Sequence, residues 1–322
     1  MKKRIGLIGL GDIAEKVYLP LLAADPHVEL AGISSRTEST VQRIAEQYRI
    51  AGRHRSVESL LEEGLDAVFV HSPTETHFDI VMSCLRHGTP VYVDKPLSYS
   101  YEQSKALASY ALEQQKLLAV GFNRRFAPMY VQAKAWLEAA GGFELCVVQK
   151  HRTKLQLHSA MHTLYDDLIH MLDLLLWLGG DEYGELQYVQ NANAEKQLLL
   201  GAGSLVFTNG DGSGGTGQFS MVRRAGSDLE KLELHGGSRS AEVVNMEAGV
   251  WSEQGALPSH ASFGSWDTIL HRRGFAGAVR HFLDCLEDPE ACLIRADRVL
   301  PSHLLVERLT ALASGGGELA CP

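Results

Sequence analysis

The first 122 residues alternate short apolar runs with segments of helical periodicity. The apolar runs have the length of strands, and they occupy residues 4–10, 28–34, 66–72, 90–94 and 117–122. Helical periodicity fills residues 40–48, 76–88 and 102–116. Apolar strands that alternate with helices are typical of a parallel sheet covered on both faces. The pattern therefore predicts an α/β fold over residues 1–122 with a doubly wound (Rossmann) sheet, which binds ligands at the carboxyl ends of its strands.

The pattern changes after Phe122. Helical periodicity predicts helices over residues 129–140, 164–180, 276–287 and 299–313. Residues 186–260 instead carry short alternating apolar and polar runs, which are typical of antiparallel strands. Residues 123–322 are therefore predicted to form an α+β domain with a largely antiparallel open sheet. We expect this domain to bind the substrate and to mediate oligomerisation.

Composition narrows the class of protein further. A chain of 322 residues, 45% of them hydrophobic, has room for two globular domains. A formal net charge of -9 argues against a nucleic-acid partner, and no apolar window reaches the length of a membrane span. The start of the chain lacks a small-residue cleavage site, so we expect a cytoplasmic protein. No metal site or disulfide is expected from the five scattered cysteines, which are Cys84, Cys146, Cys285, Cys292 and Cys321.

A dinucleotide fingerprint opens the chain. Gly9, Gly11 and Ala14 have G-x-G-x-x-A spacing after an apolar strand, and a helix is expected to begin near Asp12 and Ile13. In this context the first glycine allows a tight turn and the second lets a pyrophosphate approach the backbone. The phosphates then meet the helix N-terminus. A dinucleotide site is the better interpretation of these residues than a merely structural turn.

The end of the second strand indicates which dinucleotide is bound. NAD enzymes place an acid there for the ribose 2′-hydroxyl, whereas this chain has Ser35 followed by Arg36. A hydroxyl and a guanidinium suit a 2′-phosphate, so the residues favour NADP(H). An exposed Arg36 that stacks on adenine would still permit NAD(H).

Two further stretches carry candidate chemistry. In "VYVDKP", Pro96 favours an extended Lys95 at the end of a strand, although a solvated surface lysine is the simpler alternative. In "LYDDLIHMLDLLLWL", Asp166, His170 and Asp173 share one face of an apolar helix. A carboxylate one turn from an imidazole raises its basicity, as a general base requires. A core polar network without a catalytic role, or a zinc site, is the alternative, and Asp167 has spacing that allows it to replace Asp166.

These motifs together resemble the Gfo/Idh/MocA oxidoreductases. The resemblance rests on "VDKP", "GFNRRFAP" and D-x-x-x-H-x-x-D, and it extends through "SPTETHFDIV" at 72–81 and "RRGF" at 272–275. Within the family the chain is most similar to the MviM-like branch, which shares "KHR" at 150–152 and "LYDDLIH". The motifs are specific for the family and say little about the substrate.

The resemblance implies a role for each candidate residue. Lys95 matches the lysine of the usual E-K-P motif, which reaches the substrate hydroxyl, and Asp94 replaces the glutamate. Asp166 and His170 match the catalytic pair, and Asp173 matches a supporting acid at the substrate. The cofactor contacts implied outside the fingerprint and the second strand are Ser72, Pro73, Thr74, His77, Asp94, Lys95 and Asn123. The glycine-rich run that often precedes the catalytic helix is replaced by "HSAMHTLYD", which leaves the local substrate pocket open.

The implied reaction transfers a hydride between nicotinamide and a carbinol or ketone carbon of a sugar, polyol or related hydroxy compound. His170 acts as the base and Lys95 as a cation beside the developing alkoxide. Lys150 and Arg152 are expected to hold a polar or acidic substrate, unless they lie on a solvated strand edge. Transient oxidation that drives elimination or glycosidic cleavage, and a non-catalytic dinucleotide sensor, are the alternatives. We expect a small-molecule substrate, a homodimer or homotetramer, and neither a nucleic-acid nor a membrane partner.

Overall fold

The computed structural model describes residues 2–208 and 214–315. The chain divides into two compact units. The first comprises Met1–Phe122 and Ala278–Leu300, and the second comprises Asn123–Gly277 and Pro301–Pro322. Cys321 lies outside the described residues. No helix within the described ranges is long and apolar enough to cross a membrane.

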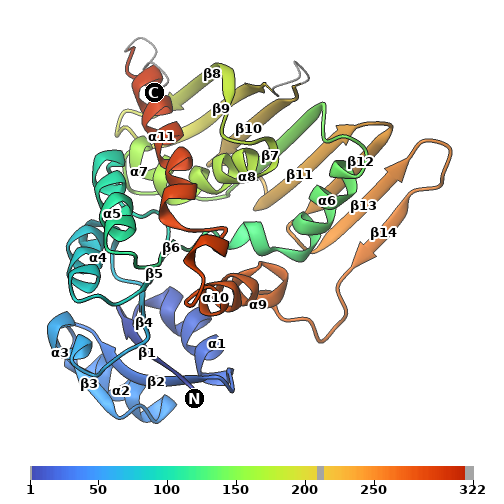
Figure 1. The fold of residues 1–322 in the computed structure, drawn as a ribbon. Helices are drawn as coiled ribbons and strands as arrows, with labels where there is room; N and C mark the ends of the chain where they lie inside the picture. Colours follow the sequence, from blue (N-terminus) through green and yellow to red (C-terminus); the bar gives the residue numbers. More distant parts are fainter. Residues whose placement is uncertain (1, 209–213, 316–322) are drawn as a thin grey trace. The chain divides into compact units, whose positions relative to one another are not determined.

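A six-stranded parallel sheet forms the centre of the first unit (Figure 1). Its strand order is β3-β2-β1-β4-β5-β6. The strands are β1 (Lys3–Ile8), β2 (Val28–Ser34), β3 (Gly52–His54), β4 (Ala67–Val70), β5 (Val91–Val93) and β6 (Leu118–Val120). Every residue of β4, β5 and β6 is buried, as expected of parallel strands covered on both faces. The prediction of a doubly wound sheet is confirmed.

Helices alternate with these strands along the chain. They are α1 (Leu19–Ala24), α2 (Glu38–Tyr48), α3 (Val57–Leu61), α4 (His77–Arg86) and α5 (Tyr101–Glu113), with shorter turns η1 (Ala14–Tyr18) and η2 (Thr74–Thr76). Ser100 begins α5 by accepting a hydrogen bond from the backbone N–H of Gln103. The sequence pattern missed β3 and α3, because both are short and β3 has little apolar character.

Residues 278–300 return to the first unit, whereas the sequence pattern placed them in the second domain. They include most of α10 (Phe275–Asp284) and the turn η5 (Pro289–Ala291). Phe282 packs edge-on against Phe69, with ring centroids 5.3 Å apart. The backbone N–H of Val120 donates to the carbonyl of Ile294 at 2.9 Å. Aromatic packing and a main-chain bond to β6 therefore draw this segment to the parallel sheet.

The second unit is built on an eight-stranded sheet of order β14-β13-β12-β11-β7-β10-β9-β8. Its strands are β7 (Leu145–His151), β8 (Tyr183–Ala192), β9 (Leu198–Phe207), β10 (Thr216–Val222), β11 (Leu229–Gly236), β12 (Arg239–Val244), β13 (Ala248–Glu253) and β14 (Ser259–Ser262). All neighbouring pairs are antiparallel except β7 and β10. The expectation of a largely antiparallel open sheet is confirmed.

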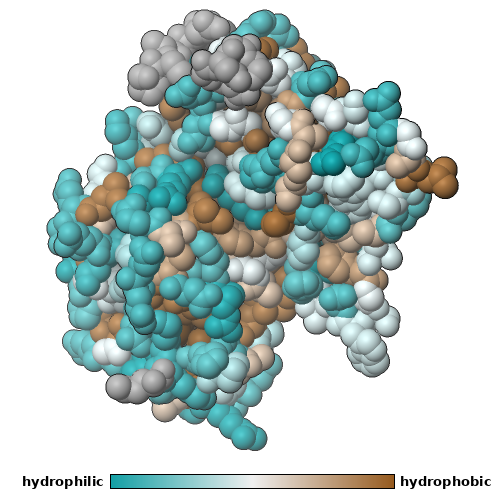
Figure 2. All heavy atoms as spheres, turned by 45° about the vertical axis from the view of Figure 1, so that its right-hand side comes forward, coloured by the Kyte–Doolittle hydropathy of each residue, from teal (hydrophilic) through white to brown (hydrophobic). Residues whose placement is uncertain are grey.

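Helices cover one face of this sheet (Figure 1). They are α6 (Pro128–Glu138), α7 (Ala160–Thr163), the π-helical turn η4 (Leu164–Leu168), α8 (Ile169–Gly179) and the part of α11 (Ala296–Ala313) that follows Leu300; η3 (Asn123–Phe126) and α9 (Ile269–Arg272) complete the unit. Buried and partly exposed residues alternate along β7 and β11, so one face of these strands is packed and the other is partly accessible. Figure 2 shows hydrophilic and hydrophobic side chains interspersed over the visible surface.

Candidate functional site

A cavity of about 670 Å³ lies in the first unit, at the carboxyl ends of the strands. The strand order reverses between β1 and β4 at this edge, which is where doubly wound sheets bind ligands. The lining includes eight of the predicted cofactor residues, namely Gly9, Gly11, Asp12, Ile13, Ser35, Arg36, Ser72 and Pro73. The structure therefore brings the fingerprint, the end of β2 and the loop after β4 together around one space.

The two fingerprint glycines have different physical roles. Gly9 has a φ of 86°, and a Cβ on it would lie 2.5 Å from the backbone nitrogen of Ser72. Only glycine fits this turn without strain. A Cβ on Gly11 would meet no protein atom within 4 Å, so the space beside its backbone is available to a ligand. The helix begins at Asp12, and its N-terminus is thus placed for phosphate binding.

The far end of the cavity is polar and carries two guanidinium groups. Arg55, Thr37 and Thr40 line it together with Ser35 and Arg36. Arg55 also forms an exposed ion pair with Glu38 at 3.5 Å. Arg55 could not be recognised from the sequence pattern, because it follows the short strand β3, which no periodicity marks. Hydroxyls and guanidiniums at this end fit a phosphate group better than a neutral ribose.

A buried histidine forms part of the cavity lining. His71 follows β4, is 5% exposed, and stacks on Tyr18 with ring centroids 3.8 Å apart. Burial lowers the pKa of His71 well below its usual value, so the ring is neutral. His71 could not be recognised from the sequence pattern, because a histidine at a strand end has no distinctive spacing.

His77 connects the loop after β4 to the loop after β5. Its Nδ1 lies 2.9 Å from the carbonyl oxygen of Pro96, and its Nε2 lies 2.9 Å from that of Ser72. A carbonyl oxygen only accepts, so an imidazolium donates to both and a neutral ring donates to one. Burial lowers the pKa of His77 and raises that of the neighbouring Asp94. His77 thus joins the loops after β4 and β5 and is not among the residues that line the cavity.

Lys95 lies beyond β5 in the same unit and is half-buried. Its backbone N–H donates to the Asp94 carboxylate at 2.9 Å, which fixes the start of the loop. Thr74, the first residue of η2, follows Ser72 and Pro73 in the loop after β4. Thr74, His77, Asp94 and Lys95 are not among the lining residues of the 670 Å³ cavity. Their assignment as cofactor contacts stays a prediction.

The predicted polar stripe belongs to the second unit. The sequence pattern predicted one continuous helix, whereas the structure inserts the π-helical turn η4 between α7 and α8. This turn contains Asp166 and Asp167, and His170 follows it on α8. Asp166 is half-buried and His170 is 7% exposed. π-helical turns are frequent at functional sites, because they change which side chains share a face.

Asp173 is 1% exposed and is held by protein partners. Arg125 donates to its carboxylate through Nε at 3.0 Å and Nη2 at 2.7 Å. The hydroxyl of Ser302 donates to the same carboxylate at 2.9 Å. These bonds give Asp173 a supporting position in the helix packing, and a direct substrate contact by Asp173 stays a prediction.

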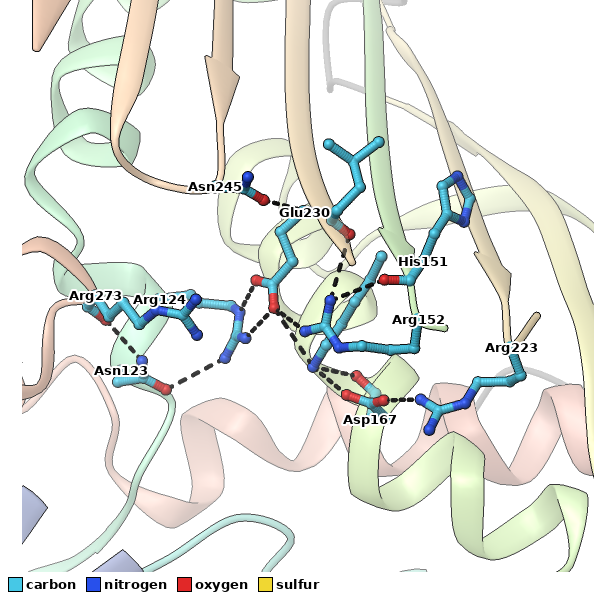
Figure 3. Close-up of polar contacts among 11 residues, drawn as sticks. Asn123, Arg124, His151, Arg152, Asp167, Arg223, Glu230, Asn245 and Arg273 are labelled. Carbon is cyan, nitrogen blue, oxygen red and sulfur yellow. Dashed lines mark hydrogen bonds and ion pairs between the residues drawn. The ribbon is translucent and has the colours of Figure 1, made fainter. Parts of the chain in front are cut away.

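Lys150 and Arg152 belong to a cluster of charges, which we call the basic cluster (Figure 3). Its members are Arg124, Lys150, Arg152, Arg223, Asp167 and Glu230. Glu230 accepts from Arg124 through Nε at 2.9 Å and Nη2 at 2.7 Å, and from Arg152 at 2.5 Å. Asp167 binds Lys150 and Arg223. The alternative of a solvated strand edge is wrong for Lys150, which is 3% exposed.

Burial and mutual attraction set the charges in this cluster. Burial lowers the pKa of Lys150 to about 7, and Arg124 and Arg152 act in the same direction. Burial alone would raise the pKa of Asp167, but Lys150 and Arg223 hold it at about 2. Glu230 likewise keeps a pKa well below its usual range in spite of its burial, because Arg124 and Lys150 surround it. Both carboxylates are therefore ionised at neutral pH.

Asn123 lies in the second unit at the start of η3, and its side chain is 2% exposed. Its amide nitrogen donates to the carbonyl of Arg273 at 2.7 Å, and its amide oxygen accepts from Arg124 at 3.4 Å (Figure 3). These bonds connect the "GFNRRFAP" and "RRGF" motifs within one unit. The predicted contact between Asn123 and the cofactor is not tested by them.

Three residues of the first unit bring metal-ligand atoms together. The ligand atoms of His281, Cys285 and Cys292 lie within 4.8 Å of one another. Nε2 of His281 already accepts a hydrogen bond from the backbone N–H of Leu293 at 2.8 Å. Burial also raises the pKa of the Cys292 thiol to about 12 and keeps it protonated. The geometry alone does not make this group a metal site.

A glycine turn at the strand-order reversal of a parallel sheet defines a dinucleotide-binding protein, and the matches to known proteins agree. The model of an oxidoreductase family with an NAD-binding Rossmann fold matches residues 3–122, and that of the YceM-like C-terminal domain matches residues 128–254. The chain belongs to the Gfo/Idh/MocA family of oxidoreductases. The predicted resemblance to this family and its MviM-like branch is confirmed.

Relatives of full and partial length support this assignment. The YceM protein of Salmonella typhimurium is 35% identical over 95% of this chain and 96% of its own length. The crystal structure of the dehydrogenase MviM from Clostridium difficile has a TM-score of 0.89 at 31% identity, and covers 97% of this chain and 100% of that one. A scyllo-inositol 2-dehydrogenase (NAD(+)) from Bacillus subtilis is 31% identical over 42% of this chain and 40% of its own.

Proposed function

We propose that this oxidoreductase transfers a hydride between NADP(H) and a carbinol or ketone carbon of a sugar, polyol or related hydroxy compound. The observation that carries the proposal is the 670 Å³ cavity, in which the glycine turn and the helix N-terminus adjoin a polar end with two guanidiniums. When bound, the nicotinamide supplies the hydride acceptor or donor. Gly9, Gly11 and the N-terminus of the helix at Asp12 would hold the phosphates.

Ser35, Arg36 and Arg55 support the choice of NADP(H). The carboxyl end of β2 has no acid that would bind a ribose 2′-hydroxyl, and all three side chains line the cavity there. Two guanidiniums provide charge-assisted hydrogen bonds to a 2′-phosphate. NAD(H) lacks that phosphate, so it offers no anionic group at this position for the guanidiniums of Arg36 and Arg55 to bind.

His170 and Lys95 carry the proton chemistry in this proposal. Oxidation of an alcohol requires the hydroxyl proton to leave, and His170 accepts it at a ring nitrogen. Lys95 donates a hydrogen bond to the oxygen as its negative charge develops. Asp166, which precedes His170 along η4 and α8, orients the imidazole. In the reverse direction His170 returns the proton to the oxygen of a ketone.

A substrate screen followed by fluorescence tests the proposal. The full-length protein is incubated with NADP⁺ and a panel of sugars, polyols and sugar acids, and the fluorescence of reduced nicotinamide is followed. We expect NADPH to accumulate with one class of hydroxy compound. Product formation without reduced cofactor would indicate transient oxidation and elimination instead. Tight cofactor binding with no conversion of any compound would favour a sensor and contradict hydride transfer.

A further inference from the structure

The basic cluster of the second unit contains more cations than carboxylates. Arg124, Arg152 and Arg223 contribute three positive charges, and Lys150, whose pKa is about 7, contributes part of a fourth, whereas Asp167 and Glu230 contribute two negative ones. Glu230 and Arg124 are buried, and Lys150 is 3% exposed. Buried charge is costly unless it is paired, so a cluster with this excess favours an anion beside it.

Arg273 adds a further cation, and its side chain has no hydrogen-bond or ion-pair partner among the described residues. Its carbonyl oxygen accepts from Asn123, whereas its guanidinium Nε is buried without an acceptor. A buried N–H donor that lacks an acceptor destabilises the folded state. Figure 3 shows Arg273 beside Arg124, on the opposite side of Glu230 from Arg152. A missing acceptor near Arg273 is therefore a second indication of an anionic ligand.

A cavity of about 440 Å³ lies between these groups. Arg152, Asp228, Glu230, Asn245, Glu247 and Arg273 line it. Its carboxylates are already occupied by protein donors. Asp228 accepts from the backbone N–H and hydroxyl of Thr153, Glu230 binds Arg124 and Arg152, and Glu247 pairs with Arg272 at 3.3 Å. Arg273 is the lining cation that no carboxylate pairs with in the described structure.

The cavity is also connected to the segment that carries His170. Arg152 and Lys150 share the Glu230 carboxylate with Arg124, and Lys150 binds both the side chain and the carbonyl of Asp167. Asp167 precedes His170 by three residues, at the junction of η4 and α8. A ligand held by Arg152 is thus held by a network that is bonded to the turn before the proposed base.

We propose that the substrate carries an oxyanion group, a carboxylate or a phosphate, and that Arg152 and Arg273 bind this group in the 440 Å³ cavity. This proposal rests on the proposed oxidoreductase function and narrows its substrate to sugar acids or sugar phosphates. A planar guanidinium matches the two oxygens of either group and gives bidentate, charge-assisted bonds. Glu230 holds Arg152 in place, and the backbone carbonyl of Arg273 is held by Asn123.

Calorimetric binding to the full-length protein in the presence of NADP⁺ tests the proposal without requiring turnover. The probes are gluconate, glucose 6-phosphate and neutral sorbitol, each at low and high salt. We expect at least one anionic probe to bind about tenfold or more tightly than sorbitol, with an affinity that falls as salt screens the charges. The anion that binds more tightly shows whether the cavity prefers a carboxylate or a phosphate. Equal affinity for sorbitol and both anions would overturn the proposal.

Arg273→Gln removes the unpaired cation, and Arg239→Gln is the matched control. Arg239 pairs with Glu253 on neighbouring strands and does not line the cavity. Arg273→Gln should weaken binding of the anionic probe about tenfold or more and leave the affinities for sorbitol and NADPH unchanged. Arg239→Gln should change none of these affinities. If Arg273→Gln fails to fold, Arg273→Lys is the second variant. It keeps the positive charge but loses the planar guanidinium that makes bidentate hydrogen bonds, and should weaken binding of the anionic probe severalfold. Unchanged anion binding in a folded Arg273 variant would contradict the proposal.

The outcome is separate from that of the proposed function. Anion binding that depends on Arg273 without any hydride transfer would refute only the oxidoreductase reaction. Hydride transfer on neutral polyols alone, with no effect of Arg273→Gln on KM, would refute only the anion subsite.

Discussion

At the scale of single residues, charge pairing determines where ionised groups are buried. Asp167 keeps its negative charge in a largely buried position because Lys150 and Arg223 surround it. Its folded pKa of about 2 lies below the ordinary value of 3.8. A carboxylate whose pKa is depressed by folding stabilises the fold above its unfolded pKa, and this contribution is lost as the pH falls toward the folded value.

Asp167→Asn should therefore alter the dependence of stability on pH. The wild type should lose about 2 kcal/mol of unfolding free energy between roughly pH 4 and pH 2 that the variant does not lose, since each pKa unit corresponds to about 1.4 kcal/mol. Urea denaturation at a series of pH values measures the difference. Parallel curves for the two proteins over this range would show that the pairing of Asp167 contributes nothing.

Cofactor choice is also decided at this scale. NADPH should protect the protein against thermal unfolding more than NADH at equal concentration, because protection grows with ligand affinity. Arg36→Ala should reduce the difference between the protection given by NADPH and that given by NADH. Adding Arg55→Ala should reduce this difference further if both guanidiniums bind the 2′-phosphate. Arg53→Ala, on β3 but outside the cavity lining, is the control. Equal protection of the wild type by NADPH and NADH would contradict the proposed preference for NADP(H).

At the scale of elements, the segment from α7 through η4 to α8 holds the proposed base. Its apolar residues bury it against the sheet, and the ion pair of Asp173 with Arg125 fixes its inner face. A buried pair contributes mainly through the cost of breaking it, since one uncompensated charge then remains. The π-helical turn places Asp166 and Asp167 immediately before this rigid part.

Asp173→Asn should destabilise the protein by about 3–5 kcal/mol, because it removes the buried carboxylate to which Arg125 donates two hydrogen bonds. The double variant Arg125→Met/Asp173→Leu removes both charges and should recover much of that loss. Chemical denaturation of the three proteins measures the effect. A single variant as stable as the wild type, but with reduced substrate affinity, would instead make Asp173 a substrate ligand.

Local pattern was sufficient to predict some parts of this protein and insufficient for others. The parallel sheet could be predicted from the alternation of apolar runs and helical segments along the chain. The glycine turn could be predicted because Gly9 and Gly11 determine the backbone conformation at their own positions. Glu230 and Arg273 could not be found in this way, because Glu230 meets Arg124 across 106 positions of sequence. The return of residues 278–300 to the first unit depends on Phe282 meeting Phe69, which no periodicity encodes.

At the scale of the whole molecule, the open sheet suggests self-association. Its strands leave one face partly accessible, and two exposed valines, Val189 and Val206, lie on β8 and β9. Antiparallel sheets place water or a partner on the face that helices do not cover. We propose that a second copy of the chain covers this face.

Light scattering on the purified chain checks this assembly. Twice or four times the chain mass of 35.3 kDa is expected at micromolar concentration. Val189→Lys places a charge on the exposed sheet strand β8 and should shift the equilibrium toward the monomer, whereas Leu112→Lys, on helix α5 of the other unit, should not. A wild-type protein that stays monomeric would rule out the proposed dimer.

The central claim is that Lys95 and His170 act on the substrate while the glycine turn holds the cofactor, and parallel measurement of turnover, NADPH affinity and melting temperature tests it. Lys95→Met and His170→Asn should reduce turnover by about 10² to 10⁴ and leave NADPH affinity within a few-fold. Asp166→Asn should reduce turnover less, since it orients the imidazole. If these residues are only structural, the melting temperature and NADPH affinity should fall together with activity. Full turnover in His170→Asn would contradict the account.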